Sequence, residues 1–322
     1  MTTIETILVT GGAGFIGSHL CDALIKKGHK VISIDDLSLG CLENIEHLKT
    51  NPSFKFIELD IIQSEKLSNV FQEEGITLVF HLAANSDIQK GAHDLKVDLN
   101  RTFLTTFSVL ECMKKNNVKK LIFSSTSAIY GEHQKSIHEN IGPLFPTSFY
   151  GAAKLSSEAY IAAYVVHFGI QAWILRFPNV IGERTTHGVI YDFINKLIKN
   201  PKELLILGDG KQNKPYLYVK DLVDGMIFSW QNSHESLNYF NLGVNSSTTV
   251  EKIAKIIIQE MNLSNVQLKY TGGKRGWVGD VPFFQYDLGK INKLGWKASR
   301  TSDEAVQESV RAELARRKIL KT

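Results

Sequence analysis

A run of glycines near the start of the chain constrains the fold more than any other feature. Gly11, Gly14 and Gly17 follow the apolar run 7–10 and open a segment with helical periodicity. Glycine permits a tight turn and lets backbone N–H groups approach a pyrophosphate, which a helix N-terminus also favours. A later run that begins at Gly273 has the same spacing, but no strand precedes it and no helix follows. The first run therefore predicts a dinucleotide site, formed by Gly11, Gly14, Phe15, Ile16 and Gly17.

Short apolar runs alternate with helix-length segments over the first 180 residues or so. They have little polar alternation, which is typical of strands buried on both faces. The expected strands are 7–10, 31–35, 54–60, 78–82, 120–125 and 173–176, and the expected helices are 15–27, 64–74, 95–116 and 149–168. Alternation of β and α elements predicts an α/β fold with a doubly wound parallel sheet of the Rossmann type.

The rhythm changes after Asn179, where glycines and prolines divide the chain into shorter pieces. Helices are still expected at 189–199, 219–231, 249–261 and 303–318. We interpret this half as a second, smaller α/β domain. The expected division gives residues 1–179 plus about 217–244 to the nucleotide-binding domain, and about 180–216 plus 245–322 to the second domain.

Composition and charge disfavour several functional classes. Lys and Arg exceed Asp and Glu by 37 − 33 = 4 residues, too few to indicate a nucleic-acid or membrane-surface partner. The 3 cysteines are scattered without metal-ligand spacing, which is typical of a reducing compartment. No apolar run reaches transmembrane length, and the first is too short for a signal peptide. We therefore expect a cytoplasmic globular protein without a metal.

Acidic residues follow the second and third expected strands. Asp35 and Asp36 can accept hydrogen bonds from ribose hydroxyls and would repel a 2′-phosphate, which favours NAD over NADP. For Asp36 the alternative is a turn or helix cap. Asp60 and Ile61 close the third strand, where an acid can meet the adenine amino group, although a turn is the more frequent role of such a residue.

Tyr150 and Lys154 lie four residues apart on an expected helix and therefore share one of its faces. A nearby ammonium group favours the phenolate and is expected to lower the pKa of the tyrosine. Three other tyrosines precede a lysine at the same spacing. Tyr150 differs because the strand before its helix ends in the hydroxyl-rich residues 124–127, which can reach the same substrate oxygen.

Taken together, these motifs resemble the extended short-chain dehydrogenase/reductases, in the NAD-dependent nucleotide-sugar epimerase/dehydratase group that includes UDP-glucose 4-epimerase. The matching stretches cover nearly the whole chain in the family's order. They are TGGAGFIGSHL (10–20), the acidic pair 35–36, ELDI (58–61), HLAA (81–84), SSTSAIYG (124–131), YGAAK (150–154), RFPNVIGER (176–184), GDGKQNKPYLYVKD (208–221) and RGWVGDV (275–281). The resemblance implies a bound NAD and a nucleotide-diphosphate sugar as substrate.

The resemblance also implies roles for individual residues. Thr126 would hold the O4 proton of the sugar, Tyr150 would be the base, and Lys154 would be its electrostatic partner and contact the nicotinamide ribose. The residues implied to line the cofactor are Leu82, Ala83 and Ala84. Those implied to bind the substrate are Asn85, Thr126, Asn179, Lys214 and Arg275, the last three at its diphosphate. The chain departs from the family at Asp98, where Asn is frequent, and at Lys214, where Arg is usual.

The end of the fifth expected strand bears on the reaction. A 4,6-dehydratase of this family carries Thr-Asp-Glu there, whereas this chain has Thr126, Ser127 and Ala128, so dehydration is disfavoured. A 4-epimerase and a 4-dehydrogenase that releases the keto sugar both remain, and the RGWVGDV loop favours the epimerase. A hypothesis from another class is a non-catalytic NAD(H)-sensing scaffold on the same fold.

The family further implies a homodimer, in which the helices near 95–116 and 149–168 form an intermolecular four-helix bundle. Both helices carry apolar residues suited to this contact. They are Phe103, Phe107 and Leu110 on one helix and Ala159, Ala163 and Val166 on the other. The alternative is that the same residues are buried within one monomer.

Overall fold

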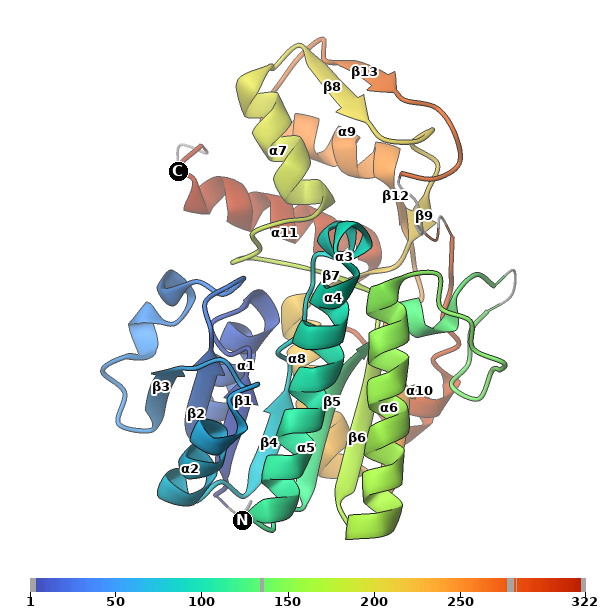
Figure 1. Cartoon of the computed structure of the whole chain (residues 1–322). Coiled ribbons are helices and arrows are strands. Elements are labelled where there is room, and N and C mark those ends of the chain that lie inside the picture. Colours follow the sequence, from blue (N-terminus) through green and yellow to red (C-terminus); the bar gives the residue numbers. More distant parts are fainter. Residues whose placement is uncertain (1–3, 134–135, 277–280, 282, 320–322) are drawn as a thin grey trace. The chain divides into compact units, whose positions relative to one another are not determined.

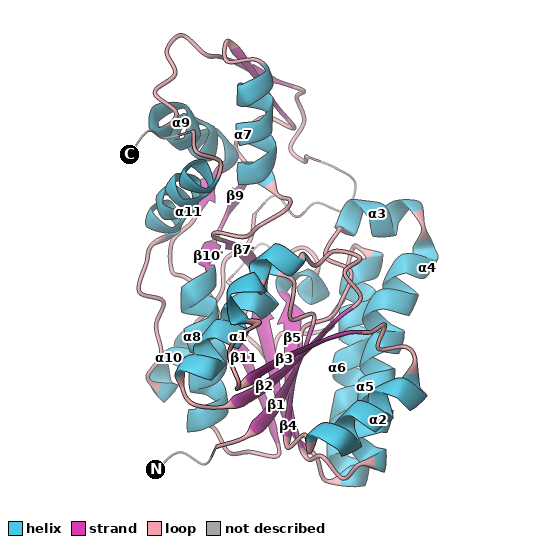
Figure 2. Cartoon of the chain, turned by 90° about the vertical axis from the view of Figure 1, so that its left-hand side faces the viewer, coloured by secondary structure: helices cyan, strands magenta, loops and turns pink. Residues whose placement is uncertain are grey.

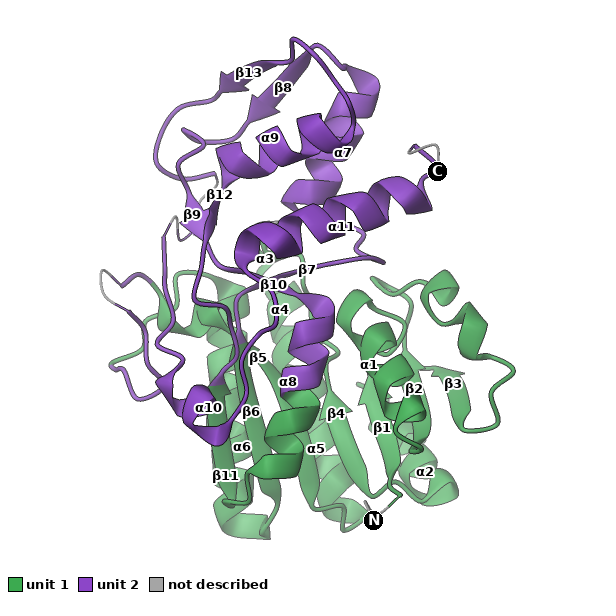
Figure 3. Cartoon of the chain, turned by 180° about the vertical axis from the view of Figure 1, so that it is seen from behind, with its two compact units in different colours: residues 1–131, 143–176, 226–240 green, residues 132–142, 177–225, 241–322 purple. Residues whose placement is uncertain are grey.

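The computed structural model describes residues 4–133, 136–276, 281 and 283–319. The chain divides into two compact units (Figure 3). The first comprises residues 1–131, 143–176 and 226–240, and the second comprises residues 132–142, 177–225 and 241–322. Each unit is an α/β assembly with a core of its own.

A parallel sheet forms the centre of the first unit (Figure 1). Within the described residues it has seven strands in the order β11-β6-β5-β4-β1-β2-β3. Their bounds are β1 (Thr6–Thr10), β2 (Lys30–Asp35), β3 (Phe54–Glu58), β4 (Leu78–His81), β5 (Lys120–Thr126), β6 (Gln171–Phe177) and β11 (Leu237–Asn241). The strand order reverses between β1 and β4, and such switch points are where open α/β sheets bind ligands. The predicted doubly wound sheet is confirmed.

Helices cover both faces of this sheet (Figure 2). One face carries α1 (Phe15–Lys26) and the C-terminal part of α8 (Val219–Asn232), and the other carries α2 (Ser64–Glu74), α5 (Thr105–Lys115) and α6 (Phe149–Phe168). Leu110 of α5 and Ile161 of α6 are fully buried in the core beneath them. Leu110 was expected at a dimer face, but its side chain is instead buried in the core of the first unit.

The helix expected over 95–116 is not one regular helix. It consists of α4 (Leu95–Asp98), a π-helical segment (Leu99–Leu104) and α5, and a short α3 (Ile88–His93) precedes it. The Thr105 hydroxyl donates to the carbonyls of Arg101 and Thr102, at 3.1 and 3.0 Å. The Thr106 hydroxyl donates to the Thr102 carbonyl at 2.8 Å. Hydroxyls bonded back to the preceding turn compete with backbone N–H groups, which suits a widened turn.

The second unit combines short strand pairs with helices. β7 (Asn179–Ile181) pairs with β10 (Tyr216–Tyr218), β8 (Glu203–Ile206) with β13 (Gln267–Tyr270), and β9 (Asn213–Lys214) with β12 (Thr248–Thr249). Its helices are α7 (Val189–Lys199), α9 (Val250–Glu260), α10 (Gly289–Leu294) and α11 (Ser302–Arg316). Apolar faces of α7, α9 and α11 meet in one core, which includes Phe193, Ile253 and Val306. The predicted smaller α/β region is confirmed.

No described helix is both long enough and apolar enough to cross a membrane. Within the described residues, no group of three or more His, Cys, Asp and Glu side chains could hold a metal ion. Residues 277–280 of the RGWVGDV loop lie outside the described part of the chain.

Candidate functional site

The glycine-rich loop packs tightly between β1 and α1. Gly11 has a φ of +72°, and a Cβ atom there would lie 2.9 Å from the backbone nitrogen of Ala83. A Cβ atom on Gly17 would lie 2.0 Å from the carbonyl oxygen of Gly11. Both positions therefore require glycine, because backbone atoms occupy the space that a side chain would need.

The first turn of α1 fits a pyrophosphate. Gly14 occupies the N-cap without a side-chain hydrogen bond, and no acidic residue lies in the first turn. The first backbone bond of the helix runs from Ser18 N to the Gly14 carbonyl at 3.0 Å. The N–H groups of the preceding residues 15–17 therefore have no partner within the helix. These donors, together with the positive end of the helix dipole, suit the phosphates of a dinucleotide.

Asp35 connects the glycine-rich loop to the end of β2. Its Oδ2 accepts a hydrogen bond from Ala13 N at 3.1 Å, and its Oδ1 accepts one from Leu37 N at 2.9 Å. The carboxylate is buried, and this desolvation raises its pKa. Asp35, which was expected to bind the ribose hydroxyls, therefore also holds the glycine-rich loop.

The other two acids each form a local turn. Asp36 Oδ1 accepts hydrogen bonds from Ser38 N at 3.0 Å and from the Ser38 hydroxyl at 2.6 Å. Asp60 Oδ1 accepts one from Ile62 N at 3.1 Å. The neighbouring Ile61 is buried. The turn alternative considered for such residues is thus present at both positions.

A buried histidine supports the segment that follows β4. The Thr106 hydroxyl gives its hydrogen to the Thr102 carbonyl, so it can only accept from His81 Nε2, 3.0 Å away. Nδ1 of the neutral ring then accepts from the Thr10 hydroxyl at 2.7 Å. Burial lowers the pKa of His81 to about 3, which keeps the ring neutral. Thr10 Oγ1 in turn accepts from the backbone N–H groups of residues 82 and 83, both at 3.2 Å.

The structure brings Thr126, Tyr150 and Lys154 together where β5 ends and α6 begins. The phenol of Tyr150 is hydrogen-bonded to the Thr126 side chain. Lys154 is almost fully buried, and its Nζ donates to the Ser124 carbonyl at 2.6 Å. The hydroxyl of Thr126 also accepts from Ala128 N at 3.1 Å. A tyrosine and a threonine hydroxyl in contact, with an ammonium one helical turn away, can move a proton to and from a substrate hydroxyl.

The protonation of this group differs from the sequence-based expectation. Burial raises the pKa of Tyr150 to about 12; the hydrogen bond to Thr126 lowers it and the charge of Asp98 raises it. Burial also lowers the pKa of Lys154 to about 7, against the opposing effect of Glu158. The expected lowering of the tyrosine pKa is therefore wrong for the protein alone, because desolvation outweighs the other effects.

Asn85 and Asp98 form a buried polar pair beside Tyr150. Asn85 Nδ2 donates to Asp98 Oδ1 and to the carbonyl of Asp87, both at 2.9 Å. Asn85 Oδ1 accepts from Asp87 N at 3.1 Å. Both Asn85 and Asp98 are 1% exposed. The side chain of Asn85, which the resemblance placed at the substrate, is thus engaged with its own surroundings.

The three residues expected at the diphosphate all belong to the second unit, and two of them, Asn179 and Lys214, lie on adjoining segments. Asn179 in β7 is the register partner of Tyr216, two residues after Lys214. A Cβ atom on Gly208 would lie 3.2 Å from the Arg275 carbonyl. The Arg275 guanidinium also pairs with Glu132 at 2.5 Å, a contact that no local motif indicated.

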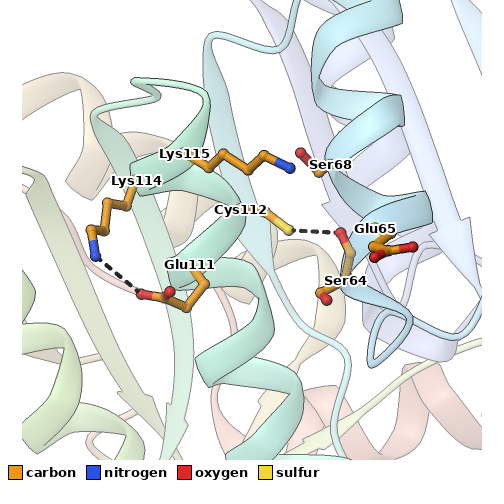
Figure 4. Close-up of a pocket in the computed structure, with 7 residues that line it drawn as sticks. All are labelled: Ser64, Glu65, Ser68, Glu111, Cys112, Lys114 and Lys115. Atoms are coloured by element: carbon orange, nitrogen blue, oxygen red, sulfur yellow. Dashed lines mark hydrogen bonds and ion pairs between the residues drawn. The ribbon is translucent and has the colours of Figure 1, made fainter.

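A separate hollow of about 460 Å³ lies between α2 and α5 (Figure 4). Its lining is of mixed charge: Ser64, Glu65, Ser68, Glu111, Cys112, Lys114 and Lys115. Glu111 and Lys114 pair across 3.7 Å, and the Cys112 thiol donates to the Ser64 carbonyl at 3.4 Å. Burial raises the pKa of that thiol to about 11, so it is not a reactive thiolate. These residues belong to helix surfaces, and none of the residues implicated above lines the hollow.

The chain is similar to known proteins over nearly its whole length. The model of the NAD dependent epimerase/dehydratase family matches residues 7–243. A Methanocaldococcus jannaschii protein that carries the name of a UDP-glucose 4-epimerase is 33% identical, over 94% of this chain and 97% of that protein. A crystal structure of UDP-glucose 4-epimerase from Thermotoga maritima, with UDP-glucose, superimposes with a TM-score of 0.87 at 32% identity, covering 98% of this chain and 100% of that one. A dTDP-D-glucose 4,6-dehydratase of Dictyostelium discoideum is 29% identical, over 95% of this chain and 81% of that enzyme.

Proposed function

The chain belongs to the NAD dependent epimerase/dehydratase family, and on this premise we propose that it is a 4-epimerase of nucleotide-diphosphate sugars. Family membership makes it an NAD-dependent enzyme that modifies such sugars. What remains to be assigned is the reaction that follows oxidation of the sugar at C4. Relatives of this chain include both 4-epimerases and 4,6-dehydratases, so the choice rests on the residues of this chain.

The cofactor site fits the first unit. The amides of residues 15–17 would hold the pyrophosphate, and Asp35, at the end of β2, would bind the adenosine ribose. Leu82 and Ala83, whose amides donate to Thr10, would line the nicotinamide side together with Ala84. Bound NAD supplies reversible acceptance of the hydride from the sugar C4.

Proton handling is assigned to the three grouped residues. Thr126 would orient the sugar O4 hydroxyl, and Tyr150 would take its proton and later return it. Lys154, whose Nζ lies 2.6 Å from the Ser124 carbonyl, would stabilise the phenolate when it forms. A pKa of about 12 for Tyr150 makes it a weak base in the resting protein, so proton transfer depends on the surroundings that the bound ligands complete.

The observation that carries the choice of reaction is the turn after Thr126. Ser127 and Ala128 follow it in the 3-10 turn Ser127–Tyr130. Loss of water across C5 and C6 needs a second acid and base at this place, and neither residue has a carboxyl group. Inversion at C4 needs no further acid or base, because the keto sugar can turn over and accept the hydride on its other face.

The reaction is tested by offering the purified protein UDP-, GDP-, CDP- and dTDP-hexoses and following the products by proton NMR. We expect one of these sugars to return with an inverted C4. Accumulation of a 4-keto sugar together with NADH absorbance would instead favour the 4-dehydrogenase. A 6-deoxy-4-keto product would identify a dehydratase. No turnover and no absorbance change with any sugar would favour the non-catalytic NAD(H) scaffold.

The second unit is proposed to hold the sugar nucleotide through Asn179, Lys214 and Arg275. Arg275→Ala should raise KM by roughly one to two orders of magnitude, as expected for loss of a charge-assisted contact of about 1.5–3 kcal/mol. The NAD content should not change. Arg311→Ala is the matched control, because Arg311 is exposed and pairs with Glu260 at 2.9 Å. Loss of NAD with an unchanged KM would show that the two halves of the site are wrongly assigned.

A further inference from the structure

Three consecutive residues at the end of β5 are bonded to three residues of α6. Thr126 is hydrogen-bonded to Tyr150, Ser124 accepts from Lys154, and the Ser125 hydroxyl donates to Glu158. Tyr150, Lys154 and Glu158 are spaced four residues apart, so they follow one face of the helix. The first two contacts belong to the proposed reactive group, and the third does not.

The third contact is held by a buried ion pair. Arg176, on the neighbouring strand β6, donates from Nε to both oxygens of Glu158 at 3.0 and 3.2 Å, and from Nη2 to Oε2 at 2.6 Å. Its Nη1 donates to the Tyr130 hydroxyl at 2.9 Å. Ser125, Glu158 and Arg176 are all less than one-tenth exposed.

Stability alone is a weak reason for such an arrangement. Desolvation of two charges cancels much of their attraction, and apolar side chains of similar size often stabilise a core equally well. A fully satisfied, directional pair does something that apolar contacts cannot, because it fixes the position of the group that it binds. Here that group is the hydroxyl of Ser125, the residue directly between Ser124 and Thr126.

We propose that Glu158 is a positioning residue of the reaction: held by Arg176 and bonded to Ser125, it fixes the end of β5 on α6 so that Thr126 faces Tyr150. This inference rests on the proposed function of Thr126 and Tyr150. Reacting groups need placement to about half an ångström, and Thr126, which ends β5, directly follows Ser125.

Ser125→Ala removes the third contact without leaving a charge unpaired. We expect kcat to fall about tenfold, whereas KM stays within about twofold and the NAD content is unchanged. Ser309→Ala is the matched control, because Ser309 is 1% exposed and its hydroxyl donates only within α11, to the Ala305 carbonyl at 2.7 Å. That control should retain the kcat of the parent enzyme.

A second variant removes the residue that holds Glu158. Glu158→Gln combined with Arg176→Met leaves no charge unpaired and keeps an acceptor for Ser125, but it removes the bonds from Arg176 that fix residue 158, so kcat should fall about as far as in Ser125→Ala. The proposal is overturned if Ser125→Ala or the double variant keeps kcat within about twofold of the parent.

Hydrogen exchange keeps this test independent of the substrate assignment. Backbone amides in residues 124–130 should exchange faster in Ser125→Ala than in the parent protein, and no faster in Ser309→Ala. Unchanged exchange at those amides would overturn the proposed positioning role of Glu158 even in an active enzyme. If the parent turns over no nucleotide sugar, the proposed function fails. Faster exchange in Ser125→Ala would still show that the bond between Ser125 and Glu158 fixes the end of β5.

Discussion

Tyr150 is the residue on which the proposed chemistry depends most directly. Tyr150→Phe removes the phenol oxygen and keeps the half-buried ring, so kcat should fall by about two orders of magnitude or more. NAD content and Tm should stay close to those of the parent. Turnover on the true substrate, the absorbance of released cofactor and calorimetry check these three expectations.

Tyr160→Phe is the matched control, because Tyr160 lies on the same helix and is 45% exposed. It should leave kcat unchanged. If Tyr150→Phe kept more than about one-tenth of the parental kcat, another group would be the base.

Asp98 is one of the groups that set the pKa of Tyr150, after burial and the hydrogen bond to Thr126. Its negative charge raises the pKa of Tyr150, so Asp98→Asn should move the acid limb of the kcat/KM profile to lower pH. Asn can still accept the hydrogen bond from Asn85, and this keeps the local packing. A profile that stays in place, or moves to higher pH, would contradict the assigned electrostatic effect.

The same substitution has a consequence for stability. Burial raises the pKa of Asp98, the hydrogen bond from Asn85 lowers it, and the charge of Asp87 raises it again, with a net increase. The folded protein therefore holds this proton more tightly than the unfolded chain does, and the resulting stability is lost as pH rises through the folded pKa. The Tm of Asp98→Asn relative to the parent should thus improve from acidic to neutral pH, as measured by calorimetry.

At the scale of elements, the turn between β1 and α1 depends on glycines, because there is no room for a side chain at these positions. Gly17→Ala would place a Cβ atom 2.0 Å from the Gly11 carbonyl oxygen and 2.8 Å from the Gly12 Cα. Backbone atoms cannot yield as a flexible side chain does, so the loop should open, with a Tm lowered by several degrees and a reduced NAD content.

Gly142→Ala is the matched control for this loop, because a Cβ atom there would meet nothing within 4 Å. Calorimetry and the cofactor absorbance of both purified variants decide the question. Equal Tm values for the two variants would show that the loop tolerates a side chain at position 17.

At the scale of the whole molecule, an apolar face on α5 and α6 suits a second copy of this chain. Phe107, Tyr160 and Val166 are 39, 45 and 81% exposed, and Tyr160 packs edge-on against Phe103 at 5.0 Å between ring centroids. Large apolar side chains gathered in this way are typical of interfaces. We propose that this face forms a homodimer.

Light scattering should therefore give twice the chain mass of 36.1 kDa, or 2 × 36.1 = 72.2 kDa, at micromolar concentration. Phe107→Glu should shift the protein to the monomer, because a charge at such a contact would be buried without a partner. A parent protein that scatters as a 36.1 kDa particle would exclude the dimer under those conditions.

Much of the fold can be predicted from the sequence because the interactions that form its helices and turns are local. The expected helices 64–74, 149–168 and 189–199 agree with α2, α6 and α7, since apolar periodicity, the Ser148 N-cap and the Gly75 and Gly169 C-caps act within a few residues. The glycine-rich loop and the grouping of Thr126 with Tyr150 and Lys154 follow from the order of strands and helices in a parallel sheet.

Burial and contacts between residues far apart in the chain decided the buried polar pairs and the protonation states. The Asn85–Asp98 pair, the Glu158–Arg176 pair and the neutral His81 each depend on atoms that lie far away in the chain. The pKa directions of Tyr150 and Lys154 follow from desolvation, which has no sequence signature. The sequence alone therefore determined most strands of the large sheet, the helices whose caps and periodicity are local, and the chemical groups that these elements carry. Only the tertiary structure decided which groups are protonated and which are held in place, because both depend on packing around each side chain.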